Sequence, residues 1–406
     1  MPDTITTTMQ VRLANGKGED FYPYNLELEE GFSSIFKGVL TLLSGKLYTH
    51  EELTALLDQS ASVTIAQRLQ DTKTMRTRYL HGIVTGVKST GVFSAGDKQD
   101  CYSYALTIEP AFVRLAHSRL TESFYRLSPP EIIGKILSKY GLTAHFSKEY
   151  INTSKYCAKL MFEQNETSDL NFIRELLGLY GLSFTFRHPR TEKGRLGAEE
   201  LFFSDGYRYP VSDVDYSDNR KIPDVSRFDS ASSGEADNLW KMDAWVMEDG
   251  IGVDGVELKA PYPNANYGSD KWRQGKTSGK DRFYSYRRQF HGYIRDAVND
   301  EIDRDIMYIL EARKRSLDIA KSSWYGTAPN LLLTPGRIFD LNRYYGVRNK
   351  SLVTALVTGI RLHCRTTWPQ YLAVSPAEEG NAEELRVEAA CMNYGGAVTD
   401  KRYCPV

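Results

Sequence analysis

The sequence predicts an α+β protein in which strand-rich regions at both ends of the chain enclose a smaller module with helices. Segments of alternating apolar and polar residues fill the N-terminal part and return in the C-terminal part. Between them, two helix patterns each end in Tyr-Gly-Leu, at 140–142 and 180–182, and a short strand pattern follows each. A Val-Thr-Gly stretch also occurs once in each strand-rich region, at 84–86 and 357–359.

The N-terminal region is predicted to consist mainly of strands. In YNLELEE, Leu26 and Leu28 alternate with polar residues. In CYSYALTIEP, the residues that share one face are Tyr102, Tyr104, Leu106 and Ile108. One helix is expected in THEELTALLD, at 49–58. These elements predict a first β-rich domain over 1–115.

The first helix of the middle module is predicted in RLSPPEIIGKILSKYGL. Ser128 and Glu131 have the spacing of a capping box, and Pro129 suits the first helical position. The predicted buried face contains Ile132, Ile136, Leu137 and Tyr140. Gly141 is expected to end the helix. The module as a whole is expected to be a small α+β domain inserted at 116–206.

The second helix of the module is predicted in QNETSDLNFIRELLGLYGLSFTF. Ser168 is a good N-cap, and Asp169 then lies near the positive end of the helix dipole. The apolar face contains Leu170, Ile173, Leu176, Leu177 and Tyr180. Gly181 can adopt the left-handed conformation that closes a helix. A strand should follow, with one face formed by Leu182, Phe184 and Phe186. Nothing in this stretch is arranged for chemistry.

The C-terminal half is expected to form a second β-rich domain over 207–376. Residues 206–236 are polar and rich in turn formers, which indicates a connection, and strands resume after them. A long loop is expected at 262–289. A helix is predicted near 299–323, from helically spaced Ile302, Ile306, Ile309 or Leu310, and Leu317. Residues 377–406 are expected to be a C-terminal connection.

The Val-Thr-Gly repeat links the two strand-rich regions. GIVTGVK at 82–88 and ALVTGIR at 355–361 match at five of seven positions when conservative exchanges are counted. Short strands rich in Val, Ile, Thr and Gly can coincide by chance. The alternative is a pair of related β-domains that flank an inserted module. The seven residues alone leave both interpretations open.

Composition excludes several classes of protein. The formal net charge of −1 argues against a chain built as a whole to bind nucleic acid or an anionic membrane. The five cysteines contain no C-x-x-C pair, which favours a reducing, cytoplasmic folding compartment. The N-terminus lacks a signal-peptide pattern, and no apolar run is long enough to span a membrane. A soluble chain without stable membrane insertion is expected.

The motifs that would indicate chemistry are incomplete. His50 and Glu51 would need a second histidine at Thr54 to form a zincin helix. GKT at 275–277 would need a glycine where Asp270 stands to form a phosphate loop. The histidines have no ligand spacing, at 50, 81, 117, 145, 188, 291 and 363. We therefore expect no catalytic, cofactor-binding or metal-binding residue, no cofactor and no enzyme.

The segment 271–288 mixes basic and aromatic residues, a combination that can bind single-stranded nucleic acid. The basic residues are Lys271, Arg273, Lys276, Lys280, Arg282, Arg287 and Arg288, and the aromatic ones are Trp272, Phe283, Tyr284 and Tyr286. A solvated loop or a protein interface is favoured over this reading. No nucleic-acid partner is expected.

Several stretches together resemble a known family, the N-terminal hub region of VgrG, the valine-glycine repeat spike protein of type VI secretion. More distantly, the chain is similar to tail-hub and late-control proteins of contractile phage tails. The stretches are EEGFSSIFKGVLTLLS (29–44), RYLHGIVTGVK (78–88), YSYALTIEPAFVRLAHSRLTESFYRLSPPEIIGKIL (102–137), FEQNETSDLNFIRELLGLYGLSFTF (162–186) and LLLTPGRIFDL (331–341).

The resemblance implies a structural hub with two related, β-barrel-like tube-type domains per chain. A homotrimer would then present six such domains as a ring that adapts a hexameric, Hcp-like inner tube to a three-fold puncturing spike. Other implied partners are baseplate components, and effectors or a PAAR-type tip bound through a C-terminal part that this sequence lacks. The chain would assemble in the cytoplasm and be secreted or injected on firing, without a signal peptide.

The same resemblance leaves alternatives open. Full spikes continue into an OB-type barrel and a β-helix, whereas this sequence ends at DKRYCPV, so it is either truncated or a hub-only protein. A tail-hub or baseplate protein of a contractile phage is the first alternative function. A hydrolytic effector enzyme is the alternative from another class, and it would require a clustered acid/base pair or a metal site.

Overall fold

The structure is a computed structural model of the 406-residue chain. It describes residues 5–14, 21–69, 75–94, 100–156, 158–192, 195–206, 214–216, 225–230, 241–242, 244–250, 255–260, 271–276, 285–289, 308–313, 315–317, 322–341, 353–366 and 380–393.

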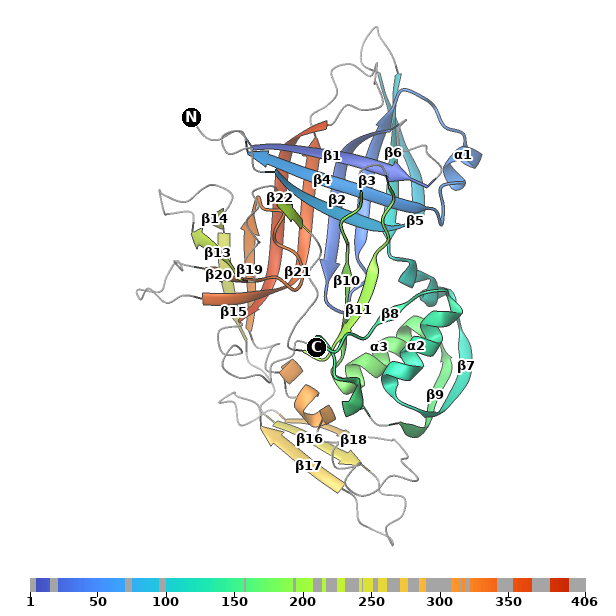
Figure 1. Ribbon diagram of the computed structural model, residues 1–406, viewed down its shortest axis with the longest axis vertical. Coiled ribbons are helices and arrows are strands. Elements are labelled where there is room, and N and C mark those ends of the chain that lie inside the picture. The colour runs from blue at the N-terminus through green and yellow to red at the C-terminus, as the bar shows by residue number, and fades with distance from the viewer. Residues whose placement is uncertain are drawn as a thin grey trace.

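A 14-stranded sheet contains strands from both ends of the chain (Figure 1). The N-terminal part contributes β1 Ile5–Leu13, β2 Tyr22–Gly31, β3 Lys37–Ser44, β4 Ser60–Leu69, β5 Met75–Ser94 and β6 Asp100–Glu109. Later residues contribute β12 Val214–Tyr216, β13 Val225–Ser230, β14 Lys241–Met242, β15 Ala244–Asp249, β19 Ser322–Ala328, β20 Ile338–Leu341, β21 Val353–Thr366 and β22 Gly380–Asn393. The two strand-rich regions are therefore joined by backbone pairing.

Eight strands of this sheet form a closed circuit in the order β2-β3-β6-β5-β4-β1-β22-β21. Strand β21 closes it, because it pairs with β2 on one side and with β22 on the other. Strands β1 and β22 meet over two residue pairs. The alternation predicted for β2 is confirmed, since Leu26 and Leu28 are buried while Glu27 and Glu29 are exposed. This pattern directs one face of the sheet into the main hydrophobic core.

The two Val-Thr-Gly stretches lie at matching β-bulges. In β5, the register to β6 shifts between Val84 and Gly86, so the intervening threonine is the extra residue. In β21, the register to β22 shifts in the same way between Val357 and Gly359. A bulge bends and twists the strand that carries it. The repeat therefore coincides with the same local irregularity in two long antiparallel pairs.

Each bulged strand also pairs in the same way with its second neighbour, β4 for β5 and β20 for β21. The carbonyl of Val84 accepts a hydrogen bond from the N–H of Asp58, just before β4, and the carbonyl of Val357 accepts one from the N–H of Gly336, just before β20. Asp58 has φ 62° and Gly336 has φ 88°. The three-strand unit β4-β5-β6 thus has the local pairing of β20-β21-β22.

Helices form at both predicted positions, although α1 covers only part of 49–58, and each begins with a capping box, of which the sequence predicted the one at α2. Helix α1 spans His50–Thr54 and begins with a reciprocal Thr49–Glu52 box. Helix α2 spans Pro129–Lys139, begins with the Ser128–Glu131 box, and ends before Gly141 at φ 68°. It buries Ile132, Ile136 and Leu137, as expected. The 3₁₀ helix η2, Ala111–His117, connects β6 to the module.

Helix α3, Asp169–Tyr180, is also confirmed together with both of its predicted ends. The Ser168 hydroxyl accepts a hydrogen bond from the N–H of Asn171, and Gly181 closes the helix at φ 66°. Asp169 is fully buried, which the sequence did not indicate. Its carboxylate accepts hydrogen bonds from the Tyr140 hydroxyl at 2.7 Å and from Gln164 Nε2 at 2.9 Å. The acidic start of α3 therefore fastens this helix to its neighbours.

The remaining elements of the module are β7 Leu120–Leu127, β8 Ala144–His145, η3 Thr153–Lys155, β9 Lys159–Thr167, β10 Ser183–Arg187 and β11 Glu200–Ser204. Strand β7 pairs with β9, and β10 and β11 form a hairpin that extends from the module to the main sheet (Figure 1). We call residues 183–204 the arm. The apolar face predicted for β10 is buried, and Ser183 and Thr185 on its other face are buried as well. The strand is covered because it lies between the module and the main sheet.

Two expectations for the C-terminal half are wrong in part. Within the loop expected at 262–289, β17 Lys271–Lys276 and β18 Ser285–Gln289 pair with β16 Gly255–Ala260 in a separate small sheet. Backbone groups form such ladders without an apolar alternation in the sequence, which is why the pattern missed them. The connection expected at 206–236 contributes β12 and β13 to the main sheet.

The end of the chain also differs from expectation. Residues 308–313 and 315–317 of the predicted helix are helical, and Ile309 and Leu310 are buried. Strand β19 begins at Ser322, one residue before the predicted helix end at 323. The expected C-terminal connection contains β22, whose buried residues include Val387, Ala389 and Cys391. Small apolar residues at alternate positions suit a buried strand face. Among the described helices, none is long and apolar enough to cross a bilayer.

Candidate functional site

The incomplete zincin and phosphate-loop motifs lie in secondary-structure elements that do not suit metal or phosphate binding. His50, Glu51 and Thr54 all belong to the five-residue helix α1, and the neighbouring Glu52 serves the helix cap. Gly275 and Lys276 lie within β17 rather than in a loop that leads into a helix. In the described part of the chain, no group of three or more His, Cys, Asp or Glu side chains is placed to hold a metal ion.

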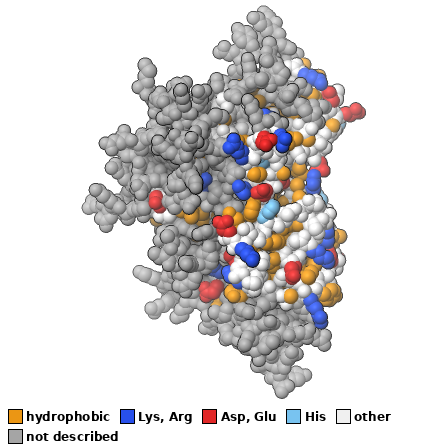
Figure 2. Space-filling model, viewed as in Figure 1, with side chains coloured by type: hydrophobic (Ala, Val, Ile, Leu, Met, Phe, Trp, Pro, Cys, Tyr) orange, Lys and Arg blue, Asp and Glu red, His pale blue; other side chains and the backbone are white. Residues whose placement is uncertain are grey.

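The basic and aromatic side chains of segment 271–288 lie outside the described residues. The backbone of this segment is described only where it forms β17 and β18. On the described part of the face drawn in Figure 2, positive and negative side chains are interspersed.

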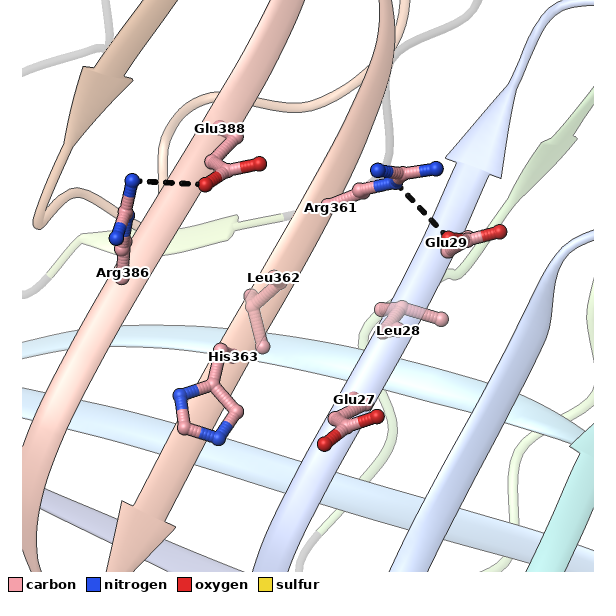
Figure 3. Close-up of a pocket in the computed structure, with 8 residues that line it drawn as sticks. All are labelled: Glu27, Leu28, Glu29, Arg361, Leu362, His363, Arg386 and Glu388. Atoms are coloured by element: carbon pink, nitrogen blue, oxygen red, sulfur yellow. Dashed lines mark ion pairs between the residues drawn. The ribbon is translucent and has the colours of Figure 1, made fainter. Parts of the chain in front are cut away.

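A shallow depression of about 220 Å³ lies over β2, β21 and β22 (Figure 3). Four of its charged residues form two ion pairs: Arg361 Nε lies 2.9 Å from Glu29 Oε1, and Arg386 Nη2 lies 2.9 Å from Glu388 Oε1. All four side chains are at least 45% exposed. Such exposed pairs remain hydrated and contribute little energy. The depression has the character of a charged protein surface rather than of a catalytic cleft.

A buried cluster of polar residues joins the arm to the main sheet. We define the histidine cluster as Glu30, Ser62, Arg78, His81 and His188. These residues come from β2, β4, β5 and the arm. Both histidines are 0% exposed, and their ring centroids lie 5.9 Å apart. Neither histidine belongs to a sequence motif, and 107 residues separate them along the chain.

Within the cluster, Ser62 and His81 have the contact that a nucleophile and its general base would have. Ser62 Oγ lies 2.9 Å from His81 Nδ1, and His81 Nε2 lies 2.9 Å from the carbonyl oxygen of Pro189. A carbonyl only accepts, so Nε2 carries the proton and Nδ1 accepts from the Ser62 hydroxyl. Ser62 Oγ also accepts from the N–H of Gly197 at 3.0 Å. The serine hydroxyl thus both donates and accepts a hydrogen bond within the protein.

The arm seals this Ser–His pair. A Cβ atom added to Gly197 would lie 2.4 Å from His81 Cε1 and Nε2, so only glycine fits over the ring. A carbonyl, not a carboxylate, orients the histidine, which differs from the usual catalytic triad. Burial lowers the pKa of His81 from 6.5 to about 4. The pair is therefore a neutral structural contact with no access for a substrate.

The rest of the cluster is a buried ion pair with a histidine beside it. Arg78 Nη2 lies 2.5 Å from Glu30 Oε2, and Arg78 Nη1 donates to the carbonyl of Leu333 at 3.3 Å. His188 Nε2 lies 3.1 Å from Glu30 Oε1, while its Nδ1 accepts from the N–H of His81. Burial tends to raise the pKa of Glu30, but Arg78 and His188 hold it below its usual value. Three parts of the chain thus meet at one buried carboxylate.

Comparison with known proteins places this fold in a family. The pattern of the phage tail baseplate hub (GPD) family matches residues 29–366. The type VI secretion system spike protein VgrG4b of Pseudomonas aeruginosa is 26% identical over 174 residues, which cover 43% of this chain and 20% of that protein. The chain thus aligns with about a fifth of the length of this relative.

Solved structures agree on the fold. A type VI secretion component of E. coli, described as similar to the T4 bacteriophage tail proteins gp27 and gp5, matches with a TM-score of 0.56 and 16% identity over 97% of this chain and 78% of that chain. A tail protein of Neisseria meningitidis MC58 matches with a TM-score of 0.58 and 10% identity over 98% of both. The resemblance to VgrG-type and phage hub proteins is confirmed. The chain belongs to the phage tail baseplate hub (GPD) family.

Proposed function

We propose that this chain is the structural hub of a type VI secretion spike, and that it assembles as a homotrimer between a hexameric inner tube and a three-fold spike. The observation that carries the proposal is the family match over 29–366. The matched bulges in β5 and β21 support a second element of it, two related β-domains on either side of the module at 116–206. Three chains would then present six related domains to a hexameric tube.

The partners follow from this role. A hexameric tube protein of the Hcp type would bind one face of the ring, and baseplate components would surround it. Effectors or a PAAR-type tip would join through the spike. The hub would assemble in the cytoplasm and leave the cell on firing.

A tail hub of a contractile phage is the second candidate. The likeness to the Neisseria tail protein, which extends over 98% of both chains, favours it specifically. A hydrolytic effector is disfavoured, because the Ser62–His81 pair lies sealed beneath the arm. We therefore propose a non-enzymatic role.

The test is binding to the end of a tube. The chain is mixed separately with the tube proteins of the type VI system and of the prophages in the same genome, and the assemblies are imaged by electron microscopy. The proposal expects three-fold density capping tubes of the secretion system. Caps on a phage tube alone would favour the second candidate, and no end-binding to either tube would contradict both.

A further inference from the structure

The arm is fastened to the main sheet in two chemically different ways. Its base, β10, is held by aromatic packing and a backbone contact. Phe186 packs edge-on against Phe36 at 5.2 Å between ring centroids, and the N–H of Ser33 donates to the carbonyl of Phe184 at 2.8 Å. None of these contacts involves a group that titrates. The attachment at the base should therefore be insensitive to pH.

The outer part of the arm, residues 188–199, is held mainly through the His81 residue. The ring donates to Pro189, the backbone N–H of His81 donates to His188, and Ser62 connects the ring to Gly197. Other contacts do not involve His81: His188 Nε2 lies 3.1 Å from Glu30 Oε1, the His188 ring packs edge-on against Phe36 at 5.0 Å between centroids, and the N–H of Ala111 donates to Glu199 Oε1 at 2.7 Å. The arm thus contacts His81 on both sides of its tip.

Only the contact with Ser62 requires a neutral His81 ring, because the Nε2–H donor to Pro189 and the backbone N–H donor to His188 are also present in the protonated residue. A protonated ring would carry a hydrogen on Nδ1 and could no longer accept from Ser62, whose own hydroxyl hydrogen would lose its partner. The titratable side chains next to the ring are Tyr79, whose ring stacks on it at 6.0 Å between centroids, and His188 from the arm at 5.9 Å. The carboxylate of the cluster, Glu30, lies against His188 and already pairs with Arg78, so it is not available to neutralise a further positive charge on His81.

We propose that the histidine cluster is an acid-sensitive clasp: protonation of His81 releases the outer part of the arm from the main sheet, while the aromatic base of the arm stays attached. Release exposes the Ser62 side of β4 and frees residues 188–199. The device depends only on the contacts described above and not on the hub role.

The expected size of the effect follows from proton linkage. The pKa of His81 is about 4 with the arm attached, and in a released arm it would return to about 6.5. The equilibrium constant for attachment of the arm should then fall about 20-fold between pH 7 and pH 5, because the released state binds one more proton than the attached state. Attachment of the arm is therefore strongest above pH 6.5 and weakens as pH falls towards 4.

Hydrogen–deuterium exchange with mass spectrometry tests the proposal on the whole chain. Protection of peptides from 188–199 is compared at pH 7 and pH 5 after correction for intrinsic exchange rates, with β10 as the internal reference. We expect about 20-fold less protection of the outer arm at pH 5 and less than a 3-fold change in β10. Equal protection of the outer arm at both pH values overturns the proposal.

Two variants separate His81 from the other histidines. His81→Gln keeps a donor for Pro189 but cannot take up a proton, so its arm should respond to pH by less than 3-fold. His363→Gln, in the depression over β21 and outside the histidine cluster, should keep the wild-type response (Figure 3). A full response in His81→Gln overturns the proposal. If that variant does not fold, hydrogen exchange at C2 of the imidazole measures His81 in the wild type, where a pKa near 6.5 would equally overturn it.

Discussion

Neighbouring glutamates on β2 provide a direct test of what the buried cluster contributes to stability. Glu29 and Glu30 point to opposite faces of the sheet, and each pairs with an arginine. The Glu30–Arg78 pair is buried, with side chains 7% and 1% exposed, whereas the Glu29–Arg361 pair is 65% and 72% exposed. The perturbation is replacement of each arginine by methionine, which keeps much of the side-chain volume and removes the charge.

The two replacements should differ several-fold in cost. Arg78→Met leaves the Glu30 carboxylate buried without its cation and removes the donor to Leu333, so we expect about 3–5 kcal/mol of destabilisation. Arg361→Met breaks a hydrated surface pair and should cost less than about 1 kcal/mol. Adding Glu30→Gln to Arg78→Met should recover part of the loss, because the unpaired buried charge is then gone.

The assay is urea unfolding followed by circular dichroism at pH 7 and at pH 4. The lowered pKa of Glu30 means that its contribution is present above its ordinary value of 4.5 and is lost as pH falls through the lowered one. The difference between the variants should therefore shrink in acid. Costs for Arg78→Met and Arg361→Met that agree within 1 kcal/mol at pH 7 would refute the reasoning.

Three further predictions concern positions elsewhere in the chain. In α3, a Cβ added by Gly178→Ala meets no atom within 4 Å, so this substitution should stabilise the protein by about 0.5–1 kcal/mol. Gly82→Ala places Cβ 2.6 Å from a backbone carbonyl oxygen and should destabilise the protein by about 1–3 kcal/mol. Thermal unfolding that ranks the two variants the other way would contradict this. Fluorophosphonate probes should not label Ser62 in the native protein, because the arm covers it, and labelling at pH 7 would count against a sealed pair. Burial raises the pKa of three thiols, so maleimide with peptide mapping should find them unreactive until urea is added: Cys101, Cys364 and Cys391.

The helices could be predicted because their signals are local. Ser168 and Gly181 lie at the two ends of α3, and each acts on backbone groups within a few residues of itself. The strand alternation at Leu26 and Leu28 is equally local, since one apolar face must meet a core. The burial of Asp169 was missed, because its partners lie on other elements.

The histidine cluster and the small sheet of β16, β17 and β18 could not be predicted from local sequence patterns. His81 and His188 meet only because the arm crosses the main sheet, a tertiary contact with no short-range signature. Strands β17 and β18 depend on backbone pairing with β16, which polar residues permit as well as apolar ones. The Val-Thr-Gly repeat was ambiguous as a sequence, and its matched bulges became visible only with the strand register.

The central claim, a hub that closes as a three-fold ring, is tested most directly by the mass of the chain in solution. A ring of three copies leaves no unpaired interface, and a standard contact of roughly 1,600 Å² per pair supports micromolar to nanomolar association. Multi-angle light scattering over a concentration series should therefore show the 46.1 kDa chain at low concentration and approach three times that mass as concentration rises. A stable dimer, or a strict monomer at the highest concentration, would contradict the ring.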